Sequence, residues 1–204
     1  MSTLEVNNIT PQSGTTLTLG GSGDTINLGS GASGLATTGG TMGVLINTTS
    51  FSAVSSQAIN SVFSSTYDNY RFILNLTAAT ADADLYLRLR NGTTDKSSNY
   101  IFAKFGRQST SGGVVSGSGA GTFFNLDSVD STATYSSYSG DILNPFNSKK
   151  TIALISMVNL ATDNQNYHQN FFSLQTEDYS ADGLNLIASA GAITGTISIY
   201  GYNK

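Results

Sequence analysis

The chain contains no cysteine and only one histidine among its 204 residues. Without cysteine there is neither a disulfide framework nor thiol chemistry. A zinc site needs several His or Cys ligands, so one histidine nearly excludes it. Charged side chains make up 11% of the residues, against about 25% in an average globular domain. Ser, Thr, Asn and Gly take their place, so we expect a surface that interacts through hydrogen bonds and shape.

The sequence also lacks a basic balance, an export signal and a long apolar run. The formal net charge is -4, which argues against nucleic acid as the main partner, since that partner favours a basic face. The first six residues have neither the basic nor the apolar part of a signal peptide. No apolar run approaches the ~20 residues of a membrane span. We therefore expect a protein made in a cytoplasm, neither exported by the usual route nor inserted in a membrane.

The residues that are present favour short strands and tight turns. The chain has 22 Gly and two Pro, and Val, Ile, Tyr and Phe are frequent. The clearest alternation runs through residues 84–90, where Leu85, Leu87 and Leu89 are expected to face inward and Asp84, Tyr86, Arg88 and Arg90 to face solvent. About nine such strands, with no amphipathic helix of normal length, predict an all-β chain with an antiparallel β-sandwich of jelly-roll type.

Residues 1–40 differ from the rest and predict an oligomeric stalk or anchor. Two units align at a nine-residue offset, TLTLG at residues 16–20 and TINLG at residues 25–29. Each has only two apolar side chains on one face, too few to offset the ordering entropy of so many Gly, Ser and Thr residues in one chain. Several copies side by side could bury these rows on a shared axis. The predicted oligomer interface consists of Leu4, Val6, Leu17, Leu19, Ile26 and Leu28. The alternative is a flexible Gly/Ser linker.

The predicted head spans residues 41–204 and contains several less regular segments. Apolar residues then recur at mixed spacings, which predicts an irregular segment with one helical turn; they are Phe51, Val54, Ile59, Val62 and Phe63. Residues 108–121 are predicted to be a Gly/Ser loop, and residues 127–137 a polar loop. In the long segment 149–160, Ile152, Leu154, Ser156 and Val158 are predicted to share one face.

Candidate catalytic residues are sparse, and we expect no enzyme. His168 would need a serine and a carboxylate beside it for a triad, and serines occur throughout the chain. Carboxylate pairs that a glycosidase could use are Asp82 with Asp84, and Asp127 with Asp130. Such pairs are more often solvated turn residues. No EF-hand spacing and no Walker-type glycine loop occur, so no metal and no cofactor are predicted.

Aromatic and amide side chains offer a better candidate for contact with a partner. Tyr135, Tyr138 and Tyr167 lie in or near polar segments, and His168 follows the last of them. Tyrosine provides flat apolar area and a hydroxyl at low entropic cost, which suits contact with a glycan or a protein. The alternative is that half or more of the tyrosines are half-buried residues of the sandwich.

Three pieces of the sequence together resemble small fibre proteins of marine tailed phages, cyanophages among them. The N-terminal piece is SGTTLTLGGSGDTINLGSG, the middle piece is VFSSTYDNYRFILNL, and the last is GTISIYGYN. The resemblance covers both ends and part of the middle, and its motifs are close to compositional. It implies a virion component, usually a homotrimer, without a fixed binding site that could be carried over.

From these features we expect a tail or head fibre whose head binds a host-surface glycan or protein. The N-terminal segment would contact other virion proteins, and the protein would be found in the virion after synthesis in the host cytoplasm. The predicted receptor contacts are Tyr135, Tyr138, Tyr167 and His168. The alternative function is a capsid decoration protein whose N-terminal segment clamps the shell.

Overall fold

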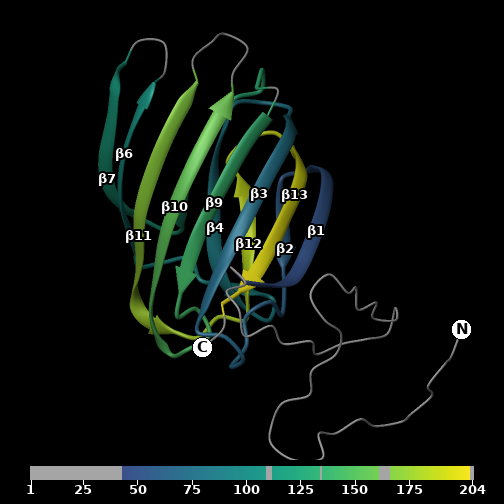
Figure 1. Ribbon diagram of the computed structural model, residues 1–204, viewed down its shortest axis with the longest axis vertical. Helices are drawn as coiled ribbons and strands as arrows, with labels where there is room; N and C mark the ends of the chain where they lie inside the picture. Colours follow the sequence, from purple (N-terminus) through teal and green to yellow (C-terminus); the bar gives the residue numbers. More distant parts are fainter. Residues whose placement is uncertain (1–42, 109–111, 134, 161–165, 203–204) are drawn as a thin grey trace, which may run out of the picture. The chain divides into compact units, whose positions relative to one another are not determined.

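The computed structural model describes residues 43–108, 112–133, 135–160 and 166–202 (Figure 1). The predicted stalk, residues 1–40, lies outside the described residues, and so do its interface residues Leu4, Val6, Leu17, Leu19, Ile26 and Leu28. The stalk and the domain boundary near residue 40 therefore remain predictions. The described part of the chain has no helix, and hence none long and apolar enough to cross a bilayer.

Two antiparallel sheets make up the described part and face each other across a shared core (Figure 1). In spatial order, the eight-stranded sheet contains β1 (Val44–Val54), β13 (Ile193–Gly201), β3 (Asn69–Ala79), β9 (Tyr135–Leu143), β10 (Lys149–Leu160), β11 (Tyr167–Tyr179), β6 (Tyr100–Gln108) and β7 (Val114–Gly121). The five-stranded sheet contains β2 (Ser56–Ile59), β12 (Gly183–Ala188), β4 (Ala83–Asn91) and β5 (Thr94–Asp95), with β8 (Phe124–Val129) also paired to β4. The predicted all-β sandwich is confirmed, and the jelly-roll type stays a prediction.

The core is built from the inward-facing side chains of strands in both sheets. Leu85, Leu87 and Leu89 of β4 are fully buried, as the alternation predicted. Across the core, Phe72 and Leu74 of β3 are also fully buried. Each strand contributes every second residue, because successive side chains of a strand point to opposite faces. The buried leucine stripe is the part of the sequence pattern that the structure bears out most directly.

Four local predictions were wrong, at least in part. The predicted loop at 127–137 includes the end of β8 and the start of β9. Phe51 and Val54 belong to β1 and Ile59 belongs to β2, and no helical turn lies there. Only Val62 and Phe63 lie in an irregular segment, where both are buried. The predicted loop at 108–121 contains β7, a strand of the large sheet. Arg90 was expected to face solvent, but its side chain is covered and pairs with Asp95.

The outer face of the large sheet is apolar in its centre. Ile152, Leu154 and Val158 share one face of β10, as predicted, but this face points away from the core. These three side chains remain 39–42% exposed. Their neighbours Ala153 and Ile155 fill the core instead. The periodicity identified the face correctly, whereas its exposure could not be derived from periodicity alone.

The first and last described strands lie side by side. β1 pairs with β13 in antiparallel register, and Val44 stands opposite Gly201. β13 in turn pairs with β3, so Gly201 also stands opposite Tyr70. The middle and last motifs of the phage-fibre resemblance are therefore neighbours in the sheet. The ring of Tyr67 covers Gly201, where an added Cβ would lie 2.4 Å from Tyr67 Cδ2.

Candidate binding surface on the five-stranded sheet

The four residues predicted to contact a receptor lie in different parts of the fold. Tyr138 is fully buried between the sheets and its hydroxyl donates to the Ser128 carbonyl at 3.0 Å, so its ring is not on the surface. Tyr167 is half-buried and packs against the core. Tyr135 and His168 lie on the outer face of the large sheet, where they stand opposite Leu160 and Val158 of β10. The four residues therefore do not form one contact surface.

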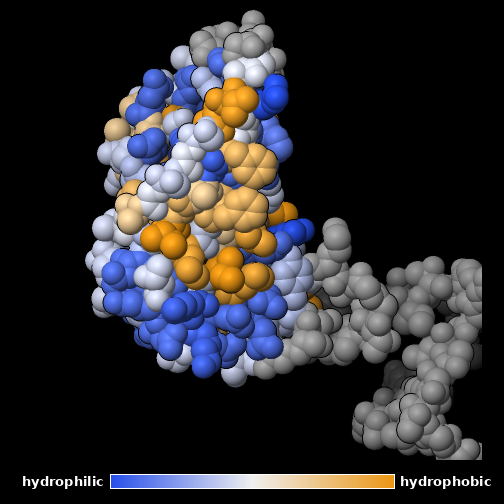
Figure 2. All heavy atoms as spheres, turned by 90° about the vertical axis from the view of Figure 1, so that its left-hand side faces the viewer, coloured by the Kyte–Doolittle hydropathy of each residue, from blue (hydrophilic) through white to orange (hydrophobic). Residues whose placement is uncertain are grey.

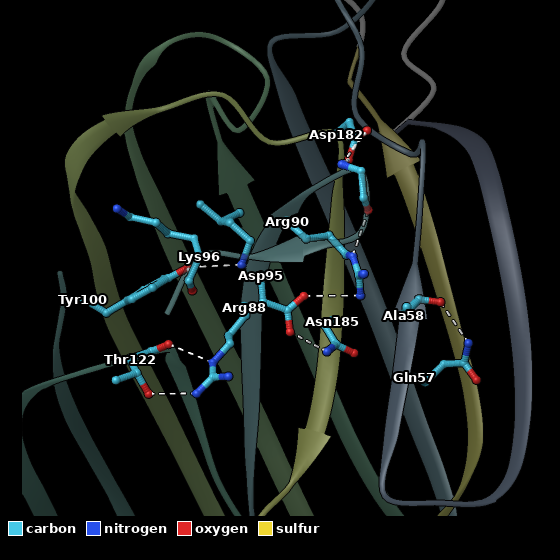
Figure 3. A network of polar contacts seen from close by, with 12 residues as sticks. Gln57, Ala58, Arg88, Arg90, Asp95, Lys96, Tyr100, Thr122, Asp182 and Asn185 are labelled. Carbon is cyan, nitrogen blue, oxygen red and sulfur yellow. Dashed lines mark hydrogen bonds and ion pairs between the residues drawn. The ribbon is translucent and has the colours of Figure 1, made fainter. Parts of the chain in front are cut away.

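A more coherent polar surface lies on the outer face of the five-stranded sheet. Because Leu85, Leu87 and Leu89 fill the core, the side chains of Tyr86 and Arg88 point outward. In the cross-strand register Asn185 stands opposite Arg88. Figure 3 shows Arg88, Arg90, Asp95 and Asn185 meeting over β4, β5 and β12. The sheet thus carries two neighbouring sets of polar contacts on this side, Arg88 with Thr122 and Asp95 with Arg90 and Asn185.

A stacked aromatic pair stands at one end of this surface. The rings of Tyr86 and Phe123 are nearly parallel, with centroids 3.6 Å apart and an interplanar angle of 18°. The Tyr86 hydroxyl donates to Asp84 Oδ2 at 3.2 Å. Partial burial, and then the nearby Asp84 carboxylate, raise the pKa of Tyr86. The ring pair therefore presents an uncharged flat area with one polar edge.

The guanidinium of Arg88 is held in a fixed orientation beside this pair. Its Nε donates to the Thr122 carbonyl at 3.0 Å, and its second terminal nitrogen donates to Thr122 Oγ1 at 3.0 Å (Figure 3). Both acceptors are uncharged, so no carboxylate neutralises Arg88 in these contacts. A planar guanidinium with five donors can then offer its remaining N–H groups to an external acceptor.

Arg90, Asp95 and Asn185 form the other end of the surface. Arg90 NH1 lies 3.3 Å from Asp95 Oδ1, and Asn185 Nδ2 donates to Asp95 Oδ2 at 2.7 Å. Arg90 also donates to the Gly92 carbonyl at 3.2 Å. Because these groups come from β4, β5 and β12, the contacts tie the three strands together. This part of the surface is a rigid support.

The carboxylates considered for catalysis all have structural partners. Asp82 accepts from the amide and the hydroxyl of Ser131 at 2.8 and 2.7 Å, and these bonds lower its pKa. Asp127 pairs with Lys104 at 2.8 Å. Asp84 accepts from Tyr86 and Asp130 accepts from Thr132. Among the described residues no group of three or more His, Asp or Glu side chains could hold a metal ion.

Some residues of this surface could be predicted from the sequence. Alternation correctly placed Tyr86 and Arg88 on the solvent face of their strand. The partner of Arg88 is Thr122, which lies 34 residues further along the chain and which the local pattern does not indicate. Phe123 could not be assigned to Tyr86 because no local pattern links β8 to β4.

Chemically, the surface combines a flat ring pair, an oriented cation and an amide with carboxylate neighbours. Such a combination suits a polar molecule with a flat apolar face. Comparisons of the chain with protein-family models, with curated proteins and with solved structures found no match.

Proposed function

We propose that the protein is a non-enzymatic virion fibre whose head binds a saccharide of the host surface. The proposed binding surface is the outer face of the five-stranded sheet, with Tyr86, Phe123 and Arg88 as the contact residues. This assignment replaces the earlier set of tyrosines, because Tyr138 is in the core and Tyr167 is packed against it.

The observation that carries the proposal is the stacked Tyr86–Phe123 pair beside the guanidinium fixed by Thr122. A sugar ring has one face of C–H groups that can lie on an aromatic ring and a rim of hydroxyls that accept hydrogen bonds. The ring pair offers the first contact and Arg88 offers donors for the second. The donors are already oriented by the fold, so binding would order few side chains.

Binding at one such surface is expected to be weak, since it is a flat platform without a deep apolar pocket. Several heads on one particle would gain avidity through effective concentration. A fibre with repeated heads is therefore the setting in which this surface would be useful. This setting agrees with the phage-fibre resemblance of the sequence.

The proposal is tested by binding of the purified protein to an array of bacterial surface polysaccharides. We expect the variants Arg88→Ala and Tyr86→Ala to lose binding while their thermal unfolding stays close to that of the unmodified protein. Lys150→Ala, an exposed cation on the other sheet, serves as the control and should bind normally. Equal binding by all three variants would rule out this surface, and no binding by the unmodified protein would argue against the saccharide.

A capsid decoration protein is the second candidate, and the apolar outer face of the large sheet favours it. Apolar surface of this kind fits a protein neighbour better than a sugar. In that case particles lacking the protein should be less stable to heat or osmotic shock. Substitutions at Arg88 and Tyr86 would then leave infection unchanged.

A further inference from the structure

The exposed apolar side chains of the described residues gather on one face of the molecule. Nine of the eleven large apolar side chains that are exposed there lie on the outer face of β6, β7, β9, β10 and β11. Figure 2, which views the molecule from the side of β6 and β7, shows a field of hydrophobic residues there in orange. We call its centre the apolar face; it consists of Ile101, Phe105, Ile152, Leu154, Val158 and Phe172.

Strand register explains why these residues lie next to one another on one face of the sheet. Leu154 of β10 stands opposite Phe172 of β11, and Phe172 stands opposite Ala103 of β6. One row further along, Ile152, Leu174 and Ile101 are aligned in the same way. Residues directly opposite in neighbouring antiparallel strands share a face, so each row is continuous across three strands.

The apolar face carries no charge of its own. Between Ile101 and Phe105, Ile152 and Val158, and Asn170 and Leu174, no outward-facing side chain is charged. The ion pair at its border is internally satisfied, with Arg71 donating to Asp141 at 2.9 and 3.0 Å. Arg107, which also faces outward at the end of β6, donates to the Gly112 carbonyl at 3.2 Å. The charges therefore lie at the border of the apolar face, and its uncharged centre can approach a second copy without repulsion between like charges.

The shape of the face also suits a protein neighbour. The rings of Phe105 and Phe172 lie parallel, with centroids 6.0 Å apart, and each side chain is 52% exposed. Beside them lie two hollows of about 380 and 330 Å³. Leu154 and Phe172 contribute to the walls of both. Projecting rings next to hollows are the elements of an interlocking contact.

The exposed area is close to what a specific interface requires. The six side chains of the apolar face, exposed by 39–52%, leave on the order of 500 Å² of apolar surface, if each fully exposed side chain contributes about 150–200 Å². A standard interface buries about 800 Å² on each partner, with an apolar centre and a polar rim. This matches the apolar share of such an interface, and a patch of this size on a protein surface is often functional.

The edge strand beside the face has no protection against pairing. β7 has the sequence VVSGSGAG, without a charge or a proline. Natural sheets usually protect an edge strand of this length with lysine, proline or a bulge. The open edge of β7 is thus continuous with the apolar face.

We propose that the apolar face is covered by a second copy of this chain, so that the heads contribute an interface of their own to the assembly. This inference goes beyond the proposed function, which uses the opposite sheet. A saccharide is a poor occupant because the row of Ile152, Leu174 and Ile101 offers no side-chain donors or acceptors. An uncharged, interlocking face of standard interface size fits a second copy of itself.

The absence of cysteine allows a direct test on the full chain. One cysteine is introduced at Ile152, in the apolar face, and in a separate protein at Ser56, which is exposed on the other sheet. The rate of labelling with a bulky maleimide is measured for each at rising protein concentration. We expect labelling at residue 152 to slow by roughly tenfold or more as copies associate, while residue 56 reacts at a constant rate. A bismaleimide should also link tagged to untagged copies through residue 152 or its neighbours Leu154 and Phe172.

Two outcomes would overturn the proposal. Equal labelling rates at both positions, without cross-links between copies, would mean that the face is open. Slow labelling at residue 152 that does not depend on concentration, again without cross-links, would mean that another segment of the same chain covers it. Neither outcome affects the saccharide assay, which tests the other sheet.

Discussion

At the scale of single residues, the ion pair between Arg90 and Asp95 is expected to be sensitive to substitution. The two side chains are only 9% and 21% accessible. Replacing Asp95 by Ala leaves the Arg90 cation covered and without its carboxylate. We expect a loss of about 3 kcal/mol in the free energy of unfolding, measured by urea denaturation.

The pair between Lys96 and Glu177 provides the matched control, because the Glu177 side chain is 52% accessible. Glu177→Ala should leave the urea midpoint nearly unchanged, since solvent screens an exposed pair. Similar losses for Asp95→Ala and Glu177→Ala would show that burial of Arg90 does not decide the cost.

The buried tyrosines predict loss of stability at alkaline pH. Burial, and then Asp141, raise the pKa of Tyr202 to about 12 from an ordinary 10.0, and burial also raises the pKa of Tyr100 and Tyr138. Above pH 10 the unfolded chain releases phenolic protons that the folded protein keeps. The free energy of unfolding should therefore fall as pH rises from 10 toward 12.

This alkaline loss is checked by urea denaturation at neutral pH and at about pH 11. Tyr138→Phe removes one of the three hydroxyls, so its stability should fall less steeply over the same interval. The explanation fails if the variant and the unmodified protein lose stability equally.

At the scale of strands, the pairing of β3 with β13 depends on a close approach at Gly201. A Cβ there would lie 2.4 Å from the Tyr67 ring, whereas at Gly117 of β7 the nearest atom would be 3.6 Å away. We expect Gly201→Ala to destabilise the head by about 1–3 kcal/mol because the ring must move. Gly117→Ala should stay within about 0.5 kcal/mol in thermal unfolding. A stable Gly201→Ala protein would show that Tyr67 can rotate away freely.

The strands that sequence reasoning found are those with large alternating side chains. β4 was predicted from its leucines, whereas β7 was missed because Gly and Ser provide no apolar period to detect. The false helical turn has a different cause. β1 contains a register shift between Phe51 and Val54, and Ala53 there has a φ of 51°. The bulge puts apolar residues three apart, which is the spacing of a helix.

The binding surface was only partly predictable for a related reason. Tyr86 and Arg88 could be placed outward from local alternation. Their partners Phe123 and Thr122 lie just before β8, and only the tertiary fold brings them close. Tyr138 was expected at the start of a strand beside a polar segment, but β9 begins three residues earlier and its alternation directs the Tyr138 side chain into the core.

At the scale of the whole molecule, the stalk and the head are expected to make separate contributions to assembly. Removal of residues 1–40 should weaken self-association and leave the head folded. Sedimentation velocity should then show a mixture of smaller species, because the apolar face of the head still associates. Thermal unfolding of the shortened protein should resemble that of the full chain, and failure to fold would place the boundary elsewhere.

The pairing of Val44 with Gly201 has a further consequence for how such a protein can change over time. The polypeptide enters and leaves the head at one corner, so the head behaves as a cassette with adjoining ends. Recombination of the gene segment that encodes the head can replace a whole head while the supporting segment stays the same. Under the proposed function, a lineage could then acquire a new host in one genetic event instead of by gradual change of its contact residues.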